Sequence, residues 1–440
     1  MKFSSSFLAL SAVAAAIFAD AAPLHPRHKK SGAVSMKNNS SAATGATMGA
    51  AYFISNEPSG NFIVSADIGS DGKLSLAQAT FTDGRGQHGD DAGKNGPDAL
   101  FSQGVIKTNA AAGLVATANP GSNSISLFKA DSTTPSKLTA FGSPISSGGE
   151  FPMSVAFNAN GTMLCALNGG AVNGVQCFTM DKDLGLVPAA NTQRAIGLNQ
   201  TTPPSGPAGS TSHLIFTEDQ STLVAAVKGN PDVNQTGFLA AWDVQADGSL
   251  SKDFTRVELP SGGALPFALA NIPGKNSLFV ADAAVGADIF DLKGGVASLA
   301  ANGNSSAAAS SASSAVQVAN STAVCWNSFS KKTGNFYVTD IGTSLVTEIN
   351  VADDLKGSIV KQYTTQTGAA TIDLDVAAIG SNDFLYVMMA NATSIQVMSL
   401  NGPGDATKLQ TLDLAAPAKN VGLSLSASNL QGMTVLVKAK

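Results

Sequence analysis

The chain has 440 residues and a formal net charge of -5, with 44% hydrophobic but only 13% charged residues. This length can bury a large core, and the low charge together with 44 glycines suits a β-rich, loop-rich extracellular protein. The body of the chain holds no run of Lys and Arg, which argues against a nucleic-acid partner because such binding needs a clustered basic surface.

The N-terminus has the pattern of an export signal over residues 1–21. Lys2 supplies a positive charge, residues 7–18 form an apolar stretch, and residues 19–21 (Ala-Asp-Ala) form a small-residue cleavage site. The apolar stretch is shorter than the roughly 18 residues that a membrane span requires, and no later segment reaches that length. The sequence therefore predicts a secreted, extracellular or cell-wall protein with no membrane span.

Two further segments precede the expected domain at 49–440. Residues 22–30 end in a Lys-Lys pair, which is typical of a propeptide cleaved by a kexin-type protease. Residues 31–48, rich in Ser, Ala, Gly, Asn and Thr, are expected to be a disordered leader. Sequons that agree with a secretory route predict N-glycosylation at Asn160, Asn199, Asn234, Asn304, Asn320 and Asn391.

One unit recurs about seven times along the chain, as two short apolar runs separated by a polar turn. In the first copy the runs cover residues 51–56 and 61–67. A period of about 50–60 residues built only from strand-length segments is typical of β-propeller blades. The copies centre on Phe53, Val115, Leu164, Val224, Phe279, Tyr337 and Tyr386.

The repeat predicts an all-β, seven-bladed propeller, with six or eight blades as the alternatives. The first unit lacks its leading strand, whereas the chain ends with apolar runs at 421–425 and 433–437. A C-terminal strand that joins the first blade would close the ring and remove its exposed edges. An Ala/Ser-rich tract at about 297–314 is expected to be a flexible surface insertion.

Two of the three cysteines lie symmetrically about a Gly-rich turn. Cys165 is six residues before Ala171 and Cys177 is six residues after it, so a regular hairpin places the two opposite each other. We expect a disulfide between them, with two packed thiols as the alternative. Cys325, which lies in an apolar run, is expected to be an inert core thiol.

Acidic residues precede a glycine in several units, as in Asp71-Gly72 and Asp247-Gly248. Such acids could suggest calcium loops, but Asp-Gly is the expected chemistry of a tight hairpin turn. We therefore expect turns between the third and fourth strands of a blade, and neither a metal nor another cofactor.

Binding clefts of propellers are lined by the loops that enter the innermost strands and by the turns between second and third strands. The loop 83–94 concentrates charged residues, including Arg85 and His88, and Lys228 begins a second-to-third strand turn. These three residues are the predicted ligand-binding residues. A solvated, Gly-rich surface loop is the alternative for 83–94.

His213 begins an inner strand, where a histidine can serve as an acid or base near neutral pH or can hydrogen-bond a neighbouring blade. Glu150 precedes the inner strand of the third blade, and Arg194 lies near an outer strand. The sequence contains no nucleophile elbow, His-Glu-X-X-His, phosphate loop or paired-cysteine motif.

The acid-Gly-X-Leu-Ser turns occur together with two distinctive runs, 96–104 (Gly-Pro-Asp-Ala-Leu-Phe-Ser-Gln-Gly) and 325–340. With these features, residues 48–437 resemble the seven-bladed lactonase family. Within that family the chain is most similar to secreted fungal proteins of the 3-carboxymuconate cyclase-like group, some of them cell-wall antigens. The resemblance implies a propeller that forms or hydrolyses lactones.

The resemblance also implies axial His, Arg and Glu side chains that move a proton and hold a carboxylate. On this sequence His213 matches the axial histidine, Glu150 the acid/base partner and Arg194 the anion clamp. The Pro-His pair of those enzymes is replaced here by residues 152–153 (Pro-Met) and 266–267 (Pro-Phe).

Two functions from different classes stay open. The first is a secreted lactonase or carboxymuconate cyclase that acts on a small carboxylate or lactone, with His213, Glu150 and Arg194 as catalytic residues. The second is a non-catalytic extracellular or cell-wall propeller, antigen- or adhesin-like, that binds glycan or protein. Either protein is expected to be a monomer.

Overall fold

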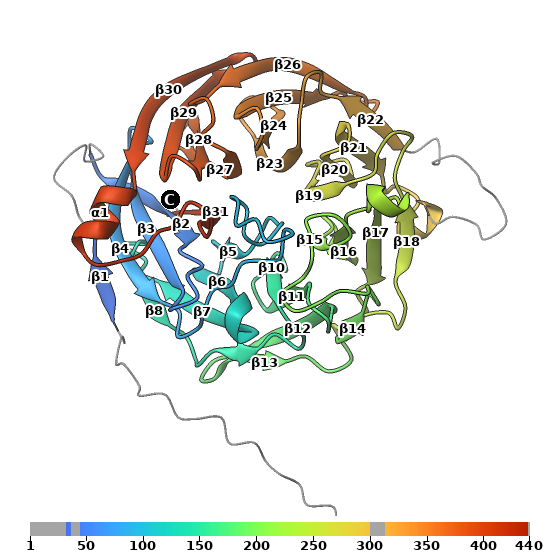
Figure 1. Ribbon diagram of the computed structural model, residues 1–440, viewed down its shortest axis with the longest axis horizontal. Helices are drawn as coiled ribbons and strands as arrows, with labels where there is room; N and C mark the ends of the chain where they lie inside the picture. Colours follow the sequence, from blue (N-terminus) through green and yellow to red (C-terminus); the bar gives the residue numbers. More distant parts are fainter. Residues whose placement is uncertain (1–31, 37–44, 300–312, 439–440) are drawn as a thin grey trace, which may run out of the picture. The chain divides into compact units, whose positions relative to one another are not determined.

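Seven antiparallel sheets surround a common axis in the computed structural model, which describes residues 32–36, 45–299 and 313–438 (Figure 1). The predicted all-β, seven-bladed propeller is confirmed. The predicted signal and propeptide, Asn304 and most of the Ala/Ser-rich tract lie outside the described residues. We number the blades in chain order, beginning with the blade that contains β2.

Blades 2 to 4 each use consecutive strands that run from the axis outward, with one short extra strand on blades 2 and 3. Blade 2 contains β5 (Ile106–Asn109), β6 (Leu114–Asn119), β7 (Ser124–Ala130), β8 (Leu138–Ala140) and β9 (Ile145–Ser146). Blade 3 contains β10 (Pro152–Phe157), β11 (Met163–Asn168), β12 (Gly174–Asp181), β13 (Gly185–Pro188) and β14 (Arg194–Ala195). Blade 4 contains β15 (Thr211–Phe216), β16 (Thr222–Val227), β17 (Phe238–Asp243) and β18 (Thr255–Glu258).

Blades 5 to 7 repeat the four-stranded order. Blade 5 contains β19 (Pro266–Asn271), β20 (Ser277–Asp282), β21 (Gly286–Asp291) and β22 (Ser313–Gln317). Blade 6 contains β23 (Val324–Ser330), β24 (Asn335–Asp340), β25 (Leu345–Val351) and β26 (Gly357–Thr364). Blade 7 contains β27 (Thr371–Ile379), β28 (Asn382–Met389), β29 (Ser394–Gly402) and β30 (Asp405–Asp413).

Blade 1 combines both ends of the described chain. Its inner strand is β31 (Gln431–Val437), followed outward by β2 (Thr47–Ile54), β3 (Phe62–Gly69), β4 (Leu74–Phe81) and β1 (Ala33–Ser35). The C-terminal strand therefore closes the ring as predicted, with Ala51 opposite Val435. An exposed sheet edge at the inner side of blade 1 is thereby removed.

Two parts of the expected disordered leader, residues 31–48, form strands: β1, and the first two residues of β2, Thr47 and Met48. Ala33–Ser35 form β1 on the outer edge of blade 1, where Val34 pairs with Ala79. The next residue, Met36, is only 2% exposed and packs in the core. This short strand is ordered because it pairs with the free backbone groups of the edge strand β4 and because Met36 packs into the core.

Helices are few in the described part of the chain. The single α-helix there is α1 (Ala415–Asn420), and the 3-10 turns are η1 (Pro120–Ser122), η2 (Pro231–Val233) and η3 (Val296–Leu299). No helix among the described residues is long and apolar enough to cross a membrane.

The core lies between blades, because each sheet is covered on both faces by its neighbours. Phe279 of blade 5 stacks on Phe336 of blade 6 at 4.2 Å between ring centroids. Nearer the axis, Phe267 meets Trp326 edge-on at 4.9 Å. Strands buried on both faces have nearly continuous apolar runs instead of alternating apolar and polar residues, as in residues 50–54 of β2.

The hairpin of blade 3 has the register that the cysteine spacing predicts. Cys165 on β11 lies directly opposite Cys177 on β12, and the structure joins them in a disulfide. Cys325 is free and buried. The Asp71-Gly72 and Asp247-Gly248 pairs lie in turns between third and fourth strands, as expected.

Candidate functional site

The inner strands carry a recurring irregularity near their first residues. In blades 3 to 7 the pairing of the inner with the second strand shifts register at the same level, and such a bulge turns side chains in a new direction. In blade 4 the shift passes over Ser212 and His213, and in blade 7 it passes over Ile372 and Asp373. His213 and Asp373 therefore occupy equivalent places on the axis-facing side of two blades.

His213 is buried, and its ring is engaged in a contact between blades. Its Nδ1 accepts the backbone N–H of Leu269 at 2.9 Å, so the neutral ring carries its proton on Nε2. Burial lowers the pKa of His213 well below its usual value, and the charge of Lys107 lowers it further. A neutral ring in this tautomer has no lone pair left to accept a proton, so the geometry favours a structural role over that of a base.

Glu150 and Arg194 are the other two predicted catalytic residues. Neither of them shares a hydrogen-bond partner with His213. The Glu150 carboxylate accepts the hydroxyl of Thr202. The Arg194 guanidinium donates to backbone carbonyls, including that of Ser251 at 2.7 Å. Among the described residues no hydrogen bond or ion pair joins any two of the predicted three, so the structure does not assemble them into one site.

Of the predicted ligand-binding residues, two contact the same segment. Arg85 is exposed. His88 places its ring edge-on to Phe101, with 6.3 Å between centroids, and lies between the carbonyl groups of Gly89 and Gly96. Lys228 is buried and donates through Nζ to the carbonyl of Phe101 at 2.7 Å.

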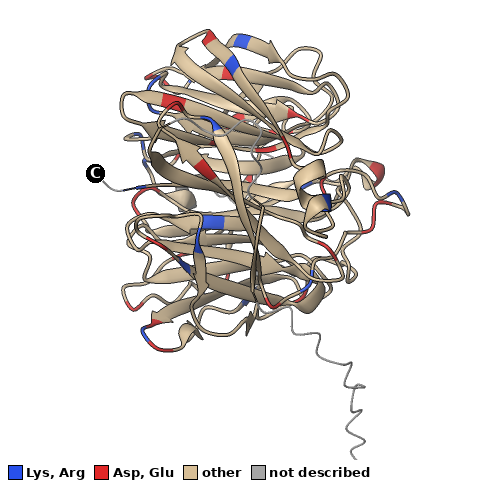
Figure 2. Ribbon diagram, turned by 90° about the vertical axis from the view of Figure 1, so that its left-hand side faces the viewer, with Lys and Arg blue, Asp and Glu red and all other residues tan. Residues whose placement is uncertain are grey.

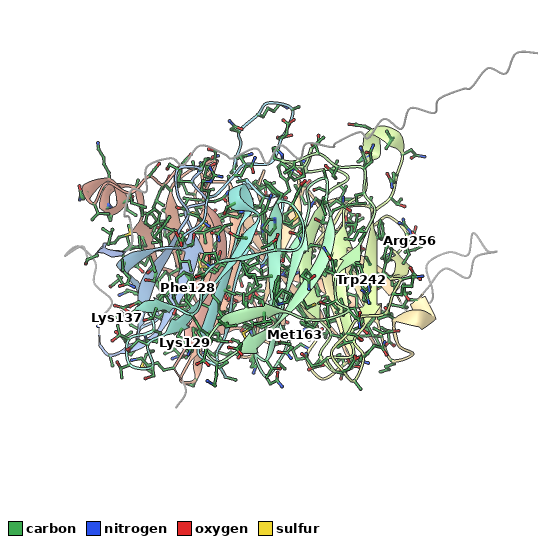
Figure 3. All side chains as sticks on the ribbon, turned by 90° about the horizontal axis from the view of Figure 1, so that it is seen from below. Phe128, Lys129, Lys137, Met163, Trp242 and Arg256 are labelled. Carbon is green, nitrogen blue, oxygen red and sulfur yellow. A yellow bond between two sulfur atoms is a disulfide. The ribbon has the colours of Figure 1, made fainter. Side chains whose placement is uncertain are left out.

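Arg256, the remaining arginine of the domain, lies on the outer side of blade 4 near Trp242 (Figure 3). Its guanidinium stacks over Phe238 at 3.7 Å and pairs with Glu258. Arg256 and Arg194 therefore both serve contacts of outer strands, and within the described ranges no cluster of arginines faces the axis.

The segment that precedes β5 runs into the middle of the ring (Figure 1). We call its residues 98–104 the axial plug. Every side chain from Asp98 to Gln103 is at most 6% exposed. The carbonyl of Ser102 accepts both the Trp326 indole N–H at 3.1 Å and the Gln431 amide at 3.0 Å. The plug therefore fills the axis at the level where the inner strands begin, which is where a cleft was expected.

The plug contains a buried acid near a buried lysine. Burial raises the pKa of Asp98, and the neighbouring Lys228 opposes that rise. Burial likewise lowers the pKa of Lys228, against the effect of Asp98. Asp98 also accepts the Gln431 amide at 2.9 Å, so this end of the axis is closed by a bonded polar cluster.

Two acids lie beyond the plug on β27. Asp373 is fully buried; its Oδ1 accepts the Gln103 amide at 3.0 Å, whereas Oδ2 has no partner among the described residues. Burial raises the pKa of Asp373 to about 8, while the charge of Lys107 opposes this rise. Asp375 accepts Ser328 Oγ at 3.1 Å and the Val435 N–H at 3.0 Å.

Lys107 on β5 lines a cavity of about 280 Å³, which we call the axial chamber. Its charge lowers the pKa of both acids, but neither acid is among the residues that line the cavity. The cavity lies where β5, β10 and β15 end, on the side of the ring opposite to the plug. Its size is just below that of pockets for drug-sized ligands, so it suits a smaller molecule. The residues that line it include Lys107, Asn109, Val155, Leu214, Phe216 and Asn271.

The sequence reasoning missed Lys107, Asp373 and Asp375. One signal for the two acids was visible: they alternate within the apolar run 372–376 (Ile-Asp-Leu-Asp-Val), which was expected to be an inner strand. Alternate residues of a strand share one face, and an inner strand has one edge toward the axis. Two acids in such a run indicate a polar face on an inner strand, whereas the direction of the Asp373 side chain depends on the register shift.

Charged residues elsewhere are interspersed. Lys and Arg alternate with Asp and Glu over the side of the ring seen in Figure 2. Among the described residues no group of three or more His, Cys, Asp or Glu side chains is placed to hold a metal ion.

Comparison by sequence gives no relative: no protein-family model matches the chain, and no curated protein matches it. Solved structures do match. A protein from Lactobacillus plantarum aligns with a TM-score of 0.57 and 12% identity over 89% of this chain and 99% of its own. A functionally unknown protein from Desulfotomaculum acetoxidans aligns with a TM-score of 0.56 and 12% identity over 89% and 100%.

The periplasmic gluconolactonase PpgL of Pseudomonas aeruginosa is also similar. It aligns with a TM-score of 0.51 and 15% identity over 69% of this chain and 82% of its own. Identities this low establish the fold alone. The chain thus has a seven-bladed propeller fold that is similar to the structure of this gluconolactonase.

Proposed function

We propose that this protein is a secreted, lactonase-like enzyme that opens or closes a small lactone in the axial chamber. The observation that carries the proposal is the buried Asp373 carboxyl, whose Oδ2 is unpartnered and whose pKa responds to Lys107 at the chamber. Buried acids with a perturbed pKa are typical of functional sites, and Lys107, whose charge lowers the pKa of Asp373, lines the chamber.

The chemistry needs an acid, a base and a charge that holds a carboxylate. In lactone opening, water forms a bond to the carbonyl carbon and the ring C–O bond breaks; a base takes a proton from the water, and an acid gives one to the departing oxygen. Asp373 would be the acid, because its pKa of about 8 keeps it protonated at neutral pH. Asp375, with hydrogen bonds to both oxygens, would be the base, and Lys107 would hold the carboxylate.

Turnover by the purified mature protein tests this proposal. Five- and six-membered lactones and carboxymuconate would be offered in a pH-stat, which measures the acid released or consumed. Asp373→Asn should lower kcat/KM by about 10²–10⁴-fold, the usual contribution of one acid or base. Lys107→Met removes the charge that holds the substrate carboxylate and should raise KM. Asp354→Asn, an exposed acid in the β25–β26 turn, is the control and should not change the rate. Full activity in Asp373→Asn would refute the assignment.

A non-catalytic extracellular or cell-wall propeller is the second candidate function. It is favoured by the separation of Glu150, Arg194 and His213, since the three residues that the family resemblance implies form no common site. Such a protein would bind glycan or protein through loops such as 83–94. No turnover of any lactone, together with specific signals on a glycan array, would support this function over the first.

The sequons bear on secretion and on which side of the ring stays accessible. Four exposed asparagines lie in loops on the plug side of the ring, whereas the exposed Asn160 lies in the β10–β11 turn on the chamber side. Glycans on the first four would leave the chamber side largely uncovered. Glycopeptide mapping of protein secreted by a eukaryotic host tests this, and a glycan on Asn160 alone would contradict it. The four asparagines are Asn199, Asn234, Asn320 and Asn391.

A further inference from the structure

The axial plug is bonded to blades far from it in the chain. The Lys228 ammonium of blade 4 donates to the plug, as do the Trp326 indole of blade 6 and the Gln431 amide of blade 1. Ser102 Oγ donates to the Met153 carbonyl of blade 3 at 2.8 Å. The plug is therefore a fixed part of the axis, and any side chain that it carries toward Asp373 is held in place.

Gln103 is that side chain. It is 3% exposed, and its Nε2 donates to Asp373 Oδ1 at 3.0 Å and to the Asn327 carbonyl at 3.0 Å. Its Oε1 accepts the Asn327 N–H at 3.2 Å. Both the Oε1 and the Nε2 of the amide are thus bonded to the backbone of Asn327 on β23. One of the two N–H groups on Nε2 remains for Asp373.

The arrangement distinguishes the two oxygens of Asp373. Oδ1 accepts two N–H groups, from Gln103 and from Leu374 at 2.9 Å, whereas Oδ2 has no partner among the described residues. An oxygen that accepts two N–H bonds is a poor place for a proton, so the neutral acid carries its proton on Oδ2. The proton is then directed away from the plug.

We propose that Gln103 is a positioning residue that fixes the Asp373 carboxyl with Oδ2 as the proton-bearing oxygen. This inference rests on the proposed function, in which Asp373 donates that proton to a departing ring oxygen. Gln103 itself touches no reacting atom. It acts by holding Oδ1 and by excluding the rotated carboxyl, in which the proton would face the plug.

The charged groups around Asp373 come from two elements. Lys107 on β5 lowers the pKa of Asp373, as does the Gln103 hydrogen bond, whereas Asp375 on β27 raises it. Removal of the Gln103 donor should therefore raise the pKa of Asp373 by about 0.5–1 pH unit, since a net hydrogen bond of typical strength corresponds to that shift.

Two substitutions separate the hydrogen bond from the space it fills. Gln103→Met keeps the length of the side chain but has no N–H to donate. The pKa of Asp373 should therefore be higher in this variant than in the native protein. Gln103→Glu has one O–H when protonated, so it can replace only one of the two hydrogen bonds that the Gln103 amide donates, and it should lose activity further as the new carboxyl ionises. Ser102→Ala, which removes one plug anchor without touching Asp373, is the matched control.

The readout is the 13C NMR titration of the Asp373 carboxyl in full-length protein labelled at aspartate Cγ, assigned with Asp373→Asn. We expect the pKa of Asp373 to be higher in Gln103→Met than in the native protein and unchanged in Ser102→Ala. The proposal would be overturned if Gln103→Met is folded, as judged by circular dichroism, and the pKa of Asp373 in it equals that of the native protein.

The pH profile of kcat separates this inference from the proposed function. A shifted carboxyl titration in a protein without turnover would leave the positioning role standing and refute the lactonase assignment. Turnover with a pH profile that Gln103→Met leaves unchanged would refute the positioning role alone.

Discussion

His213 Nδ1 accepts the backbone N–H of Leu269 at 2.9 Å and so ties the inner strand of blade 4 to that of blade 5. His213→Ala would leave this buried N–H without a partner, which costs about 1–3 kcal/mol of stability. We expect urea unfolding at a lower midpoint, with lactone turnover per folded molecule unchanged. A large loss of kcat at unchanged stability would instead support the catalytic role that the family resemblance implies.

The same histidine should make stability depend on pH on the acid side. Its pKa in the folded protein lies well below the usual 6.5, so protons bind the unfolded chain more tightly. This contribution to stability is full above about pH 6.5 and is lost as the pH falls below that value. Thermal unfolding at pH 7 and pH 5 should show a smaller difference in His213→Gln than in the native protein. Equal differences would contradict the prediction.

Asp282 and Asp288 form a buried acid pair in blade 5. Asp282 accepts the N–H groups of Ala264, Leu265 and Ala284, whereas burial and the neighbouring Asp282 raise the pKa of Asp288 to about 10. A proton on Asp288 supplies the donor that two carboxylates would lack.

The pKa of Asp288 is raised in the folded protein. Its contribution to the free energy of unfolding therefore falls as the pH rises from the ordinary Asp value near 3.9 toward about 10. Asp288→Asn keeps a donor without a titrating proton. We expect the melting temperature of this variant, relative to the native protein, to rise between pH 5 and pH 8. The exposed Asp243→Asn serves as the control, and a parallel change in both variants would refute the acid pair.

The Cys165–Cys177 disulfide closes a short loop within one hairpin, with a sequence separation of 12 residues. A loop of about 15 residues contributes roughly 3 kcal/mol in the chain-entropy model, so reduction or Cys165→Ala/Cys177→Ala should cost somewhat less. Urea unfolding with and without a reductant measures this cost. A non-reducing peptide map with both thiols free would contradict the disulfide itself.

Ring closure by β31 should be essential. Deletion of residues 431–440 would expose the inner edge of β2 and remove the Gln431 contacts to the plug. We expect aggregated or unfolded protein, whereas the intact protein should elute as a monomer in size-exclusion chromatography. A soluble, cooperatively folding deletion variant would show that closure by this strand is dispensable.

The sequence predicted the blades well because each blade is a local repeat. The Cys165–Cys177 register follows from counting residues in one hairpin, and the closing strand follows from a missing strand in the first unit. Both inferences use neighbours in the chain or the geometry of a closed ring. They do not depend on side-chain directions at the axis.

The axis itself was not predictable in the same way. Asp373 reaches its place through a register shift, which no pattern in one strand reveals. Its partner Gln103 is 270 residues away in the chain. Arg194, which the family resemblance assigns as an anion clamp, donates to carbonyl groups of an outer turn, a contact that no local sequence pattern indicates.

The axial plug has a consequence for how the chain reaches its native state. Residues 98–104 are synthesised before most of the strands that supply their partners, and the Gln431 amide arrives only with the last strand. Until then the polar backbone of this early segment must stay hydrated, so a nascent ring cannot bury its own centre. We expect slow, all-or-none assembly dominated by contacts between distant parts of the chain, and little stable structure in fragments that lack either end.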